Sequence, residues 1–232
     1  MCSRFSASFD SKELKIRWRV QSDPRLFTSR YNVAPGQDVP VIIRDEDKNQ
    51  IKAMKWGLVP SWSSDPSVGS RMINARAETL TQKPSFKNLI GRQRCVIPAN
   101  GFYEWRSDGR GKIPVWFYLK TKEPFGFAGL WDTWRDPENG DMSSFTIITT
   151  TPNALIRRFH NRMPVVFDTL AAQQWLDPLF SSQKGLRIAL QPFPSALMAA
   201  HDVSTSVNSP ENDSPDCVQP VRYEQNLRLP YL

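Results

Sequence analysis

The stretch Val115-Trp-Phe-Tyr-Leu-Lys-Thr-Lys-Glu-Pro-Phe-Gly-Phe-Ala-Gly-Leu-Trp131 gives the clearest indication of the fold. It contains two runs rich in apolar and aromatic residues, Val115–Lys120 and Phe125–Trp131, separated by a short polar turn that ends in proline. Runs of this length and composition, bounded by turn residues, are typical of strands rather than helices. The stretch therefore predicts two strands of a sheet.

Proline and glycine divide the rest of the chain into short segments, which argues against long helices. The same apolar pattern predicts further strands at Val39–Arg44, Ile51–Trp56, Arg94–Pro98 and Phe145–Thr150, and a short late one around Val203–Val207. In the strand that ends at Thr150, the two-residue period places Phe145, Ile147 and Thr149 on one face. Thr149 is thereby presented at a strand end.

Short helices are expected at Ser11–Val20, Ala75–Thr81, Pro152–Phe159 and Thr169–Leu176. Together with the strands they predict an α+β fold. In the third helix, Pro152 suits the first turn, Thr151 is the candidate cap, and His160 follows the C-terminal end. The polar segment Ser209–Asp216, with two prolines, predicts an exposed loop within a partly irregular tail over residues 210–232.

Composition limits the number of domains and suggests a partner. The 232 residues are 40% hydrophobic, enough to bury one substantial core, so we expect a single domain over residues 1–232. Lysine and arginine number 30 against 23 acidic residues, and this net charge of +7 favours a polyanion such as nucleic acid. Trp62 and Trp105 are candidate base-stacking residues, although tryptophans more often lie in the core. The alternative is a soluble protein that happens to be basic.

The cysteines, Cys2, Cys95 and Cys217, are odd in number and far apart, and the histidines His160 and His201 add no ligand pattern. Glycine-rich phosphate loops, HExxH and paired CxxC motifs are absent from the sequence, so we expect no metal and no cofactor. We find neither a signal peptide nor an apolar run long enough for a membrane span. We therefore expect a reducing intracellular location, cytoplasmic and nucleoid-associated in a bacterium or nuclear in a eukaryote.

Cys2 directly follows Met1, and removal of Met1 would leave a free amine and a thiol on adjacent carbons. Such a group attacks an aldehyde first through nitrogen, giving a Schiff base, and then through sulfur, closing a five-membered thiazolidine ring. Reference pKa values of about 7.7–8.0 for the amine and about 8.5 for the thiol leave part of each group nucleophilic near neutral pH. The alternative is a frayed terminus with an inert cysteine.

Two candidate proton-transfer residues lie in apolar or aromatic surroundings. Glu104 stands between Tyr103 and Trp105, so burial would remove its hydration and raise its pKa toward the range useful for acid–base catalysis. The alternative is a glutamate on the solvent face of a strand. His160 is a second proton-transfer candidate, or a cation that holds a phosphate or sugar oxygen. Its alternative is a histidine that interacts with the dipole of a helix end.

Polar residues accompany these candidates in the sequence. Asn74 stands where a strand is expected to pass into a helix, a position at which asparagine is an ordinary N-cap. Arg76 and Arg162 lie two residues from Asn74 and His160, which would place a guanidinium group beside each. The alternative is that both arginines are surface charges that maintain solubility.

Six motifs follow one another along the chain: Met1-Cys-x-Arg-Phe, Tyr31-Asn-Val-Ala-Pro-Gly, Trp56-Gly-Leu-Val-Pro-Ser-Trp, Ile73-Asn-Ala-Arg-Ala-Glu-Thr, Gly101-Phe-Tyr-Glu-Trp and His160-Asn-Arg-Met-Pro-Val. With Val203-Ser-Thr-Ser-Val-Asn, they closely resemble the SRAP family of SOS response-associated peptidase or abasic-site processing proteins. The matches cover nearly the whole chain. The resemblance implies a twisted, mainly antiparallel sheet that approaches a barrel and is flanked by short helices.

The resemblance also implies a function: protection of abasic sites in single-stranded DNA by a covalent crosslink, with Schiff-base lyase and self-reversal activity. It makes Cys2 the nucleophile that forms a thiazolidine with the ring-opened deoxyribose, and Glu104 the acid–base group. It makes His160 the proton donor that favours the open sugar, and Asn74 the residue that holds the sugar by hydrogen bonding. Positions expected to bind the DNA backbone match Arg4, Arg76, Thr149 and Arg162.

Ser3 departs from the glycine that the family commonly has after the cysteine, and we expect it to tune the rate. Two other functions stay open. One is an N-terminal-nucleophile cysteine peptidase, in which the Cys2 thiolate attacks a peptide carbonyl with His160 or the amine as base. The other is a non-enzymatic module that binds single-stranded DNA. The expected partner is single-stranded DNA with abasic sites, without a membrane; replication-fork partners are not indicated.

Overall fold

The computed structural model describes residues 2–21, 27–107, 109, 111–136, 138 and 140–221. The strands are β1 (Phe5–Ala7), β2 (Arg30–Val33), β3 (Asp38–Asp45), β4 (Lys48–Trp56), β5 (Asn74–Arg76), β6 (Arg94–Ala99), β7 (Gly101–Ser107), β8 (Lys112–Leu119), β9 (Phe125–Asp136), β10 (Gly140–Thr150), β11 (Met163–Pro164), β12 (Val166–Phe167) and β13 (Met198–Asp202). The helices are α1 (Ser11–Trp18), α2 (Pro84–Lys87), α3 (Thr169–Leu176) and α4 (Gln183–Ala189). None of the helices in these ranges has the length and apolar character needed to span a membrane.

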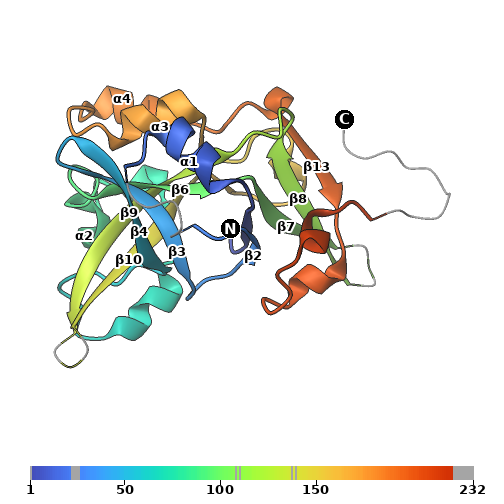
Figure 1. Cartoon of the computed structure of the whole chain (residues 1–232), viewed down its shortest axis with the longest axis horizontal. Coiled ribbons are helices and arrows are strands. Elements are labelled where there is room, and N and C mark those ends of the chain that lie inside the picture. Colours follow the sequence, from blue (N-terminus) through green and yellow to red (C-terminus); the bar gives the residue numbers. More distant parts are fainter. Residues whose placement is uncertain are drawn as a thin grey trace.

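The strands form two sheets. In the larger one, pairing of β9 with β10 closes β10, β4, β3, β6 and β9 into a ring, with β11, β5 and β12 at its edges. Only β4 and β5 run parallel to their partner β10; the other pairings of the named strands are antiparallel. The smaller sheet has the order β13–β8–β7–β1–β2. Figure 1 shows the two sheets beside each other, with α1, α3 and α4 over one end. The predicted α+β class and the nearly closed, mainly antiparallel sheet are confirmed.

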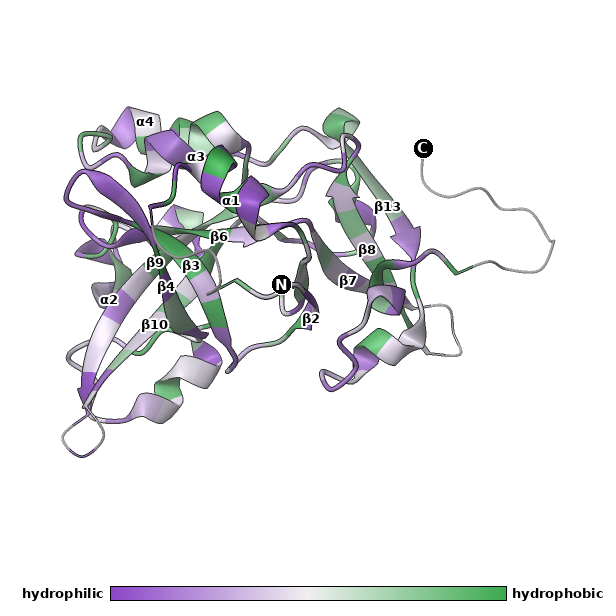
Figure 2. Ribbon diagram, viewed as in Figure 1, coloured by the Kyte–Doolittle hydropathy of each residue, from purple (hydrophilic) through white to green (hydrophobic). Residues whose placement is uncertain are grey.

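The aromatic core packs strand β1 of the smaller sheet against the larger sheet. Phe5 is fully buried, and its ring centre lies 5.1 Å from that of Trp56 and 5.6 Å from that of Phe127. Phe5 also pairs with Val33 of β2 and with Phe102 of β7. Burial of one such side chain contributes roughly 1.5–3 kcal/mol. Figure 2 shows hydrophobic colour concentrated in the strands near the middle of the molecule and hydrophilic colour at the far end of the β9–β10 hairpin. The residues just before Phe5 are therefore held at the centre of the fold.

Most long elements agree with the sequence prediction. Strands are present at each of the six longer predicted positions, and helix α3 has the predicted bounds Thr169–Leu176. Helix α1 begins at Ser11 as predicted but ends at Trp18 instead of Val20. Arg19 has a φ of 51°, in the left-handed region, and therefore stops the helix.

Two predicted helices are wrong. The segment predicted as a helix at Ala75–Thr81 begins as strand β5, whose backbone pairs with β10, and only Ala77–Thr79 form a 3₁₀ turn. Tertiary pairing has overridden the local signal. Of the predicted helix Pro152–Phe159, one 3₁₀ turn at 156–158 is present. The N-cap of this turn is Leu155 rather than Thr151, and the Asn153 side-chain oxygen accepts hydrogen bonds from the backbone N–H groups of residues 155 and 156, at 3.1 and 3.0 Å.

The C-terminal region also differs from the prediction. The strand expected at Val203–Val207 is wrong, since β13 ends at Asp202 and residues 205–208 form a 3₁₀ turn. The predicted loop over residues 209–216 is mostly exposed, but Asp213 forms an ion pair with Arg30 and Cys217 is buried. This segment is therefore tied to β2, and residues 222–232 of the predicted tail lie outside the described part of the chain.

Candidate functional site

Cys2 lies where the chain enters the centre of the molecule. Figure 1 shows the start of the described chain between the two sheets. Cys2 is fully buried, and its Sγ lies 4.0 Å from the carbonyl oxygen of Arg4. Burial, and then the negative charge of Glu104, raise the pKa of the Cys2 thiol well above its ordinary value. The thiol is thus protonated near neutral pH and needs a base before sulfur can act as a nucleophile.

The side chain of Asn74 holds the backbone of Cys2. It begins strand β5 and pairs with Ile147 of β10, so it is a strand residue and not the helix cap that the sequence allowed. Its Nδ2 donates a hydrogen bond of 2.8 Å to the carbonyl oxygen of Cys2. Its Oδ1 is buried and accepts no hydrogen bond from another described residue. That oxygen is available to a bound molecule.

Glu104 projects into the same region from strand β7. It pairs with Val115 of β8 and is only 4% exposed, so the alternative of a glutamate on a solvent face is wrong. Desolvation raises the pKa of this carboxyl to about 7, and the positive N-terminal amino group limits the rise. A carboxyl with this pKa is present in both protonation states at neutral pH, which suits it to proton transfer.

His160 follows the 3₁₀ turn at 156–158, and its ring is oriented by the backbone. Its Nδ1 lies 3.0 Å from the backbone nitrogen of Arg162 and 3.2 Å from the carbonyl oxygen of the same residue, and the tautomer of the ring decides which of these contacts is the hydrogen bond. Burial, and then the positive charge of the N-terminal amino group, lower its pKa. His160 is therefore mainly neutral at pH 7 and lies near the start of the chain.

Arg162 lies in a corner made of charged and backbone groups. Its guanidinium donates to both carboxylate oxygens of Glu78, at 2.6 and 2.9 Å, and to the carbonyl oxygen of Thr149, at 2.6 Å. The Thr149 side chain is fully buried, so this residue offers its carbonyl rather than an exposed hydroxyl. Arg76 is exposed and is one of the cations that lower the pKa of Glu78. The two arginines thus form one positive corner, of which Glu78 neutralises a part.

The side chains of Arg4 and Trp105 form hydrogen bonds within the protein. Arg4 donates to the side-chain oxygen of Asn32 and to the carbonyl oxygen of Val207, both at 2.7 Å. The Trp105 Nε1–H donates to the side-chain oxygen of Asn208 at 2.7 Å, and the Arg4 guanidinium lies 6.0 Å from the Trp105 ring. Together they fix the C-terminal turn over residues 205–208 beside the segment that precedes strand β1.

Trp62 is displayed on the surface rather than buried, with 66% of the residue exposed. Its loop is fixed on both sides: the Ser61 N–H donates to the Asp132 carboxylate at 2.8 Å, and the Trp134 Nε1–H donates to the Ser63 carbonyl at 2.7 Å. An indole held in this way can stack on another flat ring with little loss of entropy.

The structure brings Cys2, Asn74, Glu104 and His160 together around the chain start, from four segments that are distant in sequence. The sequence prediction missed Glu78, although it belongs to the motif that contains Asn74. The signal that could have found it is its position two residues after Arg76, where a strand turns away. No group of three or more metal-ligating side chains occurs among the residues that the structure describes.

Comparison with known proteins gives consistent matches. The family model described as SOS response associated peptidase (SRAP) matches residues 1–210. The chain is 40% identical over 222 residues to "Abasic site processing protein YoqW" of Bacillus subtilis, covering 94% of this chain and 99% of that protein. It is 34% identical to "Abasic site processing protein HMCES" of Gallus gallus over 227 residues, covering 82% of this chain and 66% of that protein.

Solved structures agree with these matches. A crystal structure of a protein from Bacteroides thetaiotaomicron superposes with a TM-score of 0.82 at 30% identity, covering 94% of this chain and all of that one. A protein from Bordetella bronchiseptica superposes with a TM-score of 0.75 at 25% identity, covering 88% of this chain and all of that one.

Proposed function

Because this chain belongs to the SOS response-associated peptidase (SRAP) family, we propose that it processes abasic sites in DNA by capturing their aldehyde covalently at Cys2. The names of its relatives support abasic-site processing. The observation that carries the chemistry is the convergence of Cys2, Asn74 and a carboxyl of pKa about 7 at the chain start.

The first bond forms between the Cys2 nitrogen, freed by removal of Met1, and C1 of the ring-opened deoxyribose. The resulting carbinolamine is protonated on its hydroxyl and loses water, which leaves a Schiff base. Cys2 Sγ then adds to the same carbon, the thiol proton passes to nitrogen, and the thiazolidine ring closes. No oxidant or reductant is consumed, and the reverse steps release the aldehyde and the free cysteine.

Glu104 moves the protons in these steps. The raised pKa of the Cys2 thiol means that its proton must be removed as sulfur attacks, and the Glu104 carboxylate is the base beside it. Since the pKa of Glu104 is about 7, its protonated form can also supply the proton with which the hydroxyl leaves as water. The same group serves the reverse reaction.

His160 and Asn74 act on the sugar. In the tautomer with the proton on Nε2, His160 donates to the ring oxygen of the deoxyribose as the ring opens to the aldehyde. Asn74 holds the Cys2 carbonyl through Nδ2, and its unpartnered Oδ1 accepts a hydrogen bond from a sugar hydroxyl. The Schiff base also acidifies C2 of the sugar, so elimination of the 3′ phosphate is the lyase side reaction.

The DNA strand is held by the positive corner and by Trp62. Arg76 and Arg162 bind backbone phosphates, and the exposed indole of Trp62 stacks on an unpaired base, which favours single strands over duplex. Thr149 contributes by orienting Arg162 through its carbonyl. Arg4 and Trp105 contribute by fixing the turn at residues 205–208 next to the N-terminal segment.

The test is the intact mass of untagged protein after incubation with a single-stranded oligonucleotide that carries one abasic site. We expect loss of Met1 and a denaturant-stable adduct of protein plus DNA minus one water. Cys2→Ala should form no thiazolidine, and Cys2→Ser should give only a Schiff base that borohydride traps. Cys217→Ala, which removes a thiol outside the site, is the matched control. An undiminished stable adduct with Cys2→Ala would refute the mechanism.

The same proteins and oligonucleotides distinguish two other functions from abasic-site capture. A cysteine peptidase needs a thiolate, whereas burial keeps the Cys2 thiol protonated, so we limit peptidase activity to removal of Met1. Persistence of Met1 in Glu104→Gln but not in wild type would indicate self-cleavage, and equal trimming would indicate a host aminopeptidase. A simple DNA-binding module predicts equal affinity for intact and abasic strands without any covalent species.

A further inference from the structure

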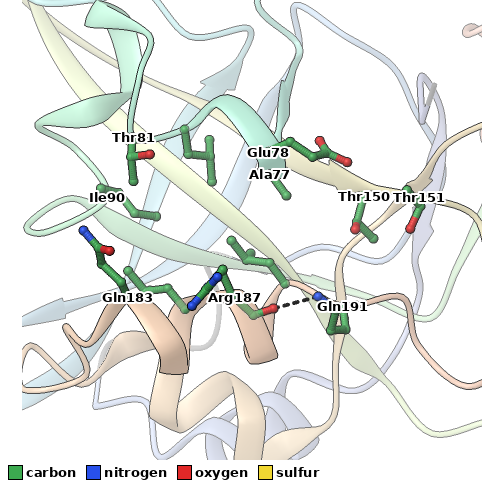
Figure 3. Close-up of a pocket in the computed structure, with 12 residues that line it drawn as sticks. Ala77, Glu78, Thr81, Ile90, Thr150, Thr151, Gln183, Arg187 and Gln191 are labelled. Atoms are coloured by element: carbon green, nitrogen blue, oxygen red, sulfur yellow. Dashed lines mark hydrogen bonds between the residues drawn. The ribbon is translucent and has the colours of Figure 1, made fainter.

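A cavity of about 540 Å³ opens next to the positive corner, and the proposed reaction does not use it. It lies between the 3₁₀ turn that follows β5, the end of β10 and helix α4. Figure 3 shows Glu78, Thr150 and Thr151 on one side of this cavity and Gln183, Arg187 and Gln191 of the α4 region on the other. Cavities of this size accommodate small organic ligands.

The floor of the cavity is apolar and its rim is polar. Leu80, Ile90 and Leu190 lie at the floor, each less than a tenth exposed. At the rim, the Arg187 guanidinium and the Gln183 amide have no hydrogen-bond or ion-pair partner within the part of the chain that the structure describes. Gln191 is different, because its amide N–H donates to the carbonyl oxygen of Arg187 at 2.8 Å. A flat ligand with apolar faces, polar edges and a negative charge matches this lining.

The cavity is continuous with the corner that holds Arg162. Glu78 belongs to both, since it lines the cavity and forms the ion pair with Arg162. Thr150 of the cavity wall directly follows Thr149, whose carbonyl accepts the Arg162 hydrogen bond. The mouth of the cavity therefore lies next to the place where we propose that a DNA phosphate binds.

We propose that this cavity is a nucleobase subsite, which takes a base of the bound strand near the lesion while Arg187 neutralises the phosphate of the same nucleotide. The base lies on Leu80 and Leu190, and the Gln183 amide reaches its edge. The subsite rests on the proposed function, because its ligand is the strand that carries the abasic site. It would add affinity on one side of the lesion only.

The experiment scans the flanks of the lesion. Short single-stranded oligonucleotides carry one abasic site, and each of the neighbouring nucleotides in turn is replaced by a tetrahydrofuran spacer, which lacks both base and aldehyde. Adduct yield against oligonucleotide concentration gives an apparent affinity for wild type, Gln183→Ala and Arg187→Gln. Lys184→Gln removes one positive charge from the same helix at an exposed residue outside the cavity, and is the matched control.

In wild type we expect one flanking position at which loss of the base weakens binding by about fivefold to tenfold, the worth of one or two hydrogen bonds and an apolar contact. In Gln183→Ala, removal of the base at this position should weaken binding much less than in wild type. In Lys184→Gln, it should weaken binding as much as in wild type. Arg187→Gln should weaken binding more than Lys184→Gln does. A photoreactive iodouracil at that position should crosslink to a peptide containing residues 183–191.

Two results would overturn the subsite. One is an equal effect of the spacer at every flanking position, and the other is an identical response of Arg187→Gln and Lys184→Gln with no photo-adduct on α4. These failures differ from failure of the proposed function, in which wild type would form no Cys2-dependent adduct with any of the oligonucleotides.

Discussion

Replacement of Glu104 by glutamine should abolish a proton-transfer group and at the same time stabilise the protein at alkaline pH. Burial raises the pKa of this carboxyl from 4.5 to about 7, so the folded state binds its proton more tightly than the unfolded state does. The stability associated with the protonated carboxyl is fully present below pH 4.5 and is lost as the pH rises through 7. Glutamine has the same shape and carries no charge at any pH.

The rise in the pKa of Glu104 from 4.5 to about 7 corresponds to about 3 kcal/mol of stability at pH 8. Glu104 is 4% exposed, so solvent screening removes little of this value. We compare the free energy of unfolding of Glu104→Gln with that of wild type at each pH. This difference should favour Glu104→Gln by about 3 kcal/mol more at pH 8 than at pH 4. For a chain of this length that equals a rise in Tm of roughly 6–12 °C.

The assay is urea unfolding of both proteins from pH 4 to pH 9, with Glu211→Gln as control because that glutamate is exposed. Crosslinking to abasic DNA over the same pH range should rise through pH 7 in wild type and be about a hundredfold slower in Glu104→Gln. Parallel stability curves for wild type and Glu104→Gln across this range would refute the assignment of a raised pKa to Glu104, and with it the proposed acid–base role.

Three further predictions concern Glu78, Trp62 and Asn74. Glu78→Gln should break the ion pair with Arg162 and cost about 1 kcal/mol at pH 7, because the pair is only partly buried. This loss should diminish as the pH falls through the lowered pKa of Glu78, and urea unfolding at pH 7 and at a series of lower pH values tests it. Trp62→Ala should weaken binding to single-stranded DNA by about 1–3 kcal/mol with unchanged Tm, measured by fluorescence anisotropy. Asn74→Asp should slow adduct formation by placing a negative charge against the Cys2 carbonyl, whereas Asn74→Gln should retain more activity; quenched time courses compare the two.

The long strands were predictable because their apolar runs are local. Val115–Lys120 and Phe125–Trp131 carry enough aromatic and branched residues to form strands in any sheet, and both are present. Strand β5 was not predictable in this way, since Asn74–Arg76 are extended only because β10 lies alongside them. Strand β1 is equally short, and it is fixed by the burial of Phe5 against Trp56.

The proposed site divides in the same manner. The chemistry at Cys2 followed from an amine and a thiol on adjacent carbons, and the motifs supplied Asn74, Glu104 and His160. The sequence did not indicate that Trp62 is exposed while Thr149 is buried. It also did not indicate that Arg4 donates a hydrogen bond to a backbone carbonyl of the C-terminal turn. Nor did it indicate that Glu78 forms an ion pair with Arg162.

By itself, then, the sequence determined the α+β class, the long strands and the family, and it indicated the proposed reactive group at Cys2, because each depends on residues that are neighbours in the chain. Only the tertiary structure decided which side chains lose their water. The pKa of Glu104 and the protonation of the Cys2 thiol both follow from burial and from contacts between distant segments. Desolvation depends on everything that packs around a group, and no local stretch of sequence specifies that.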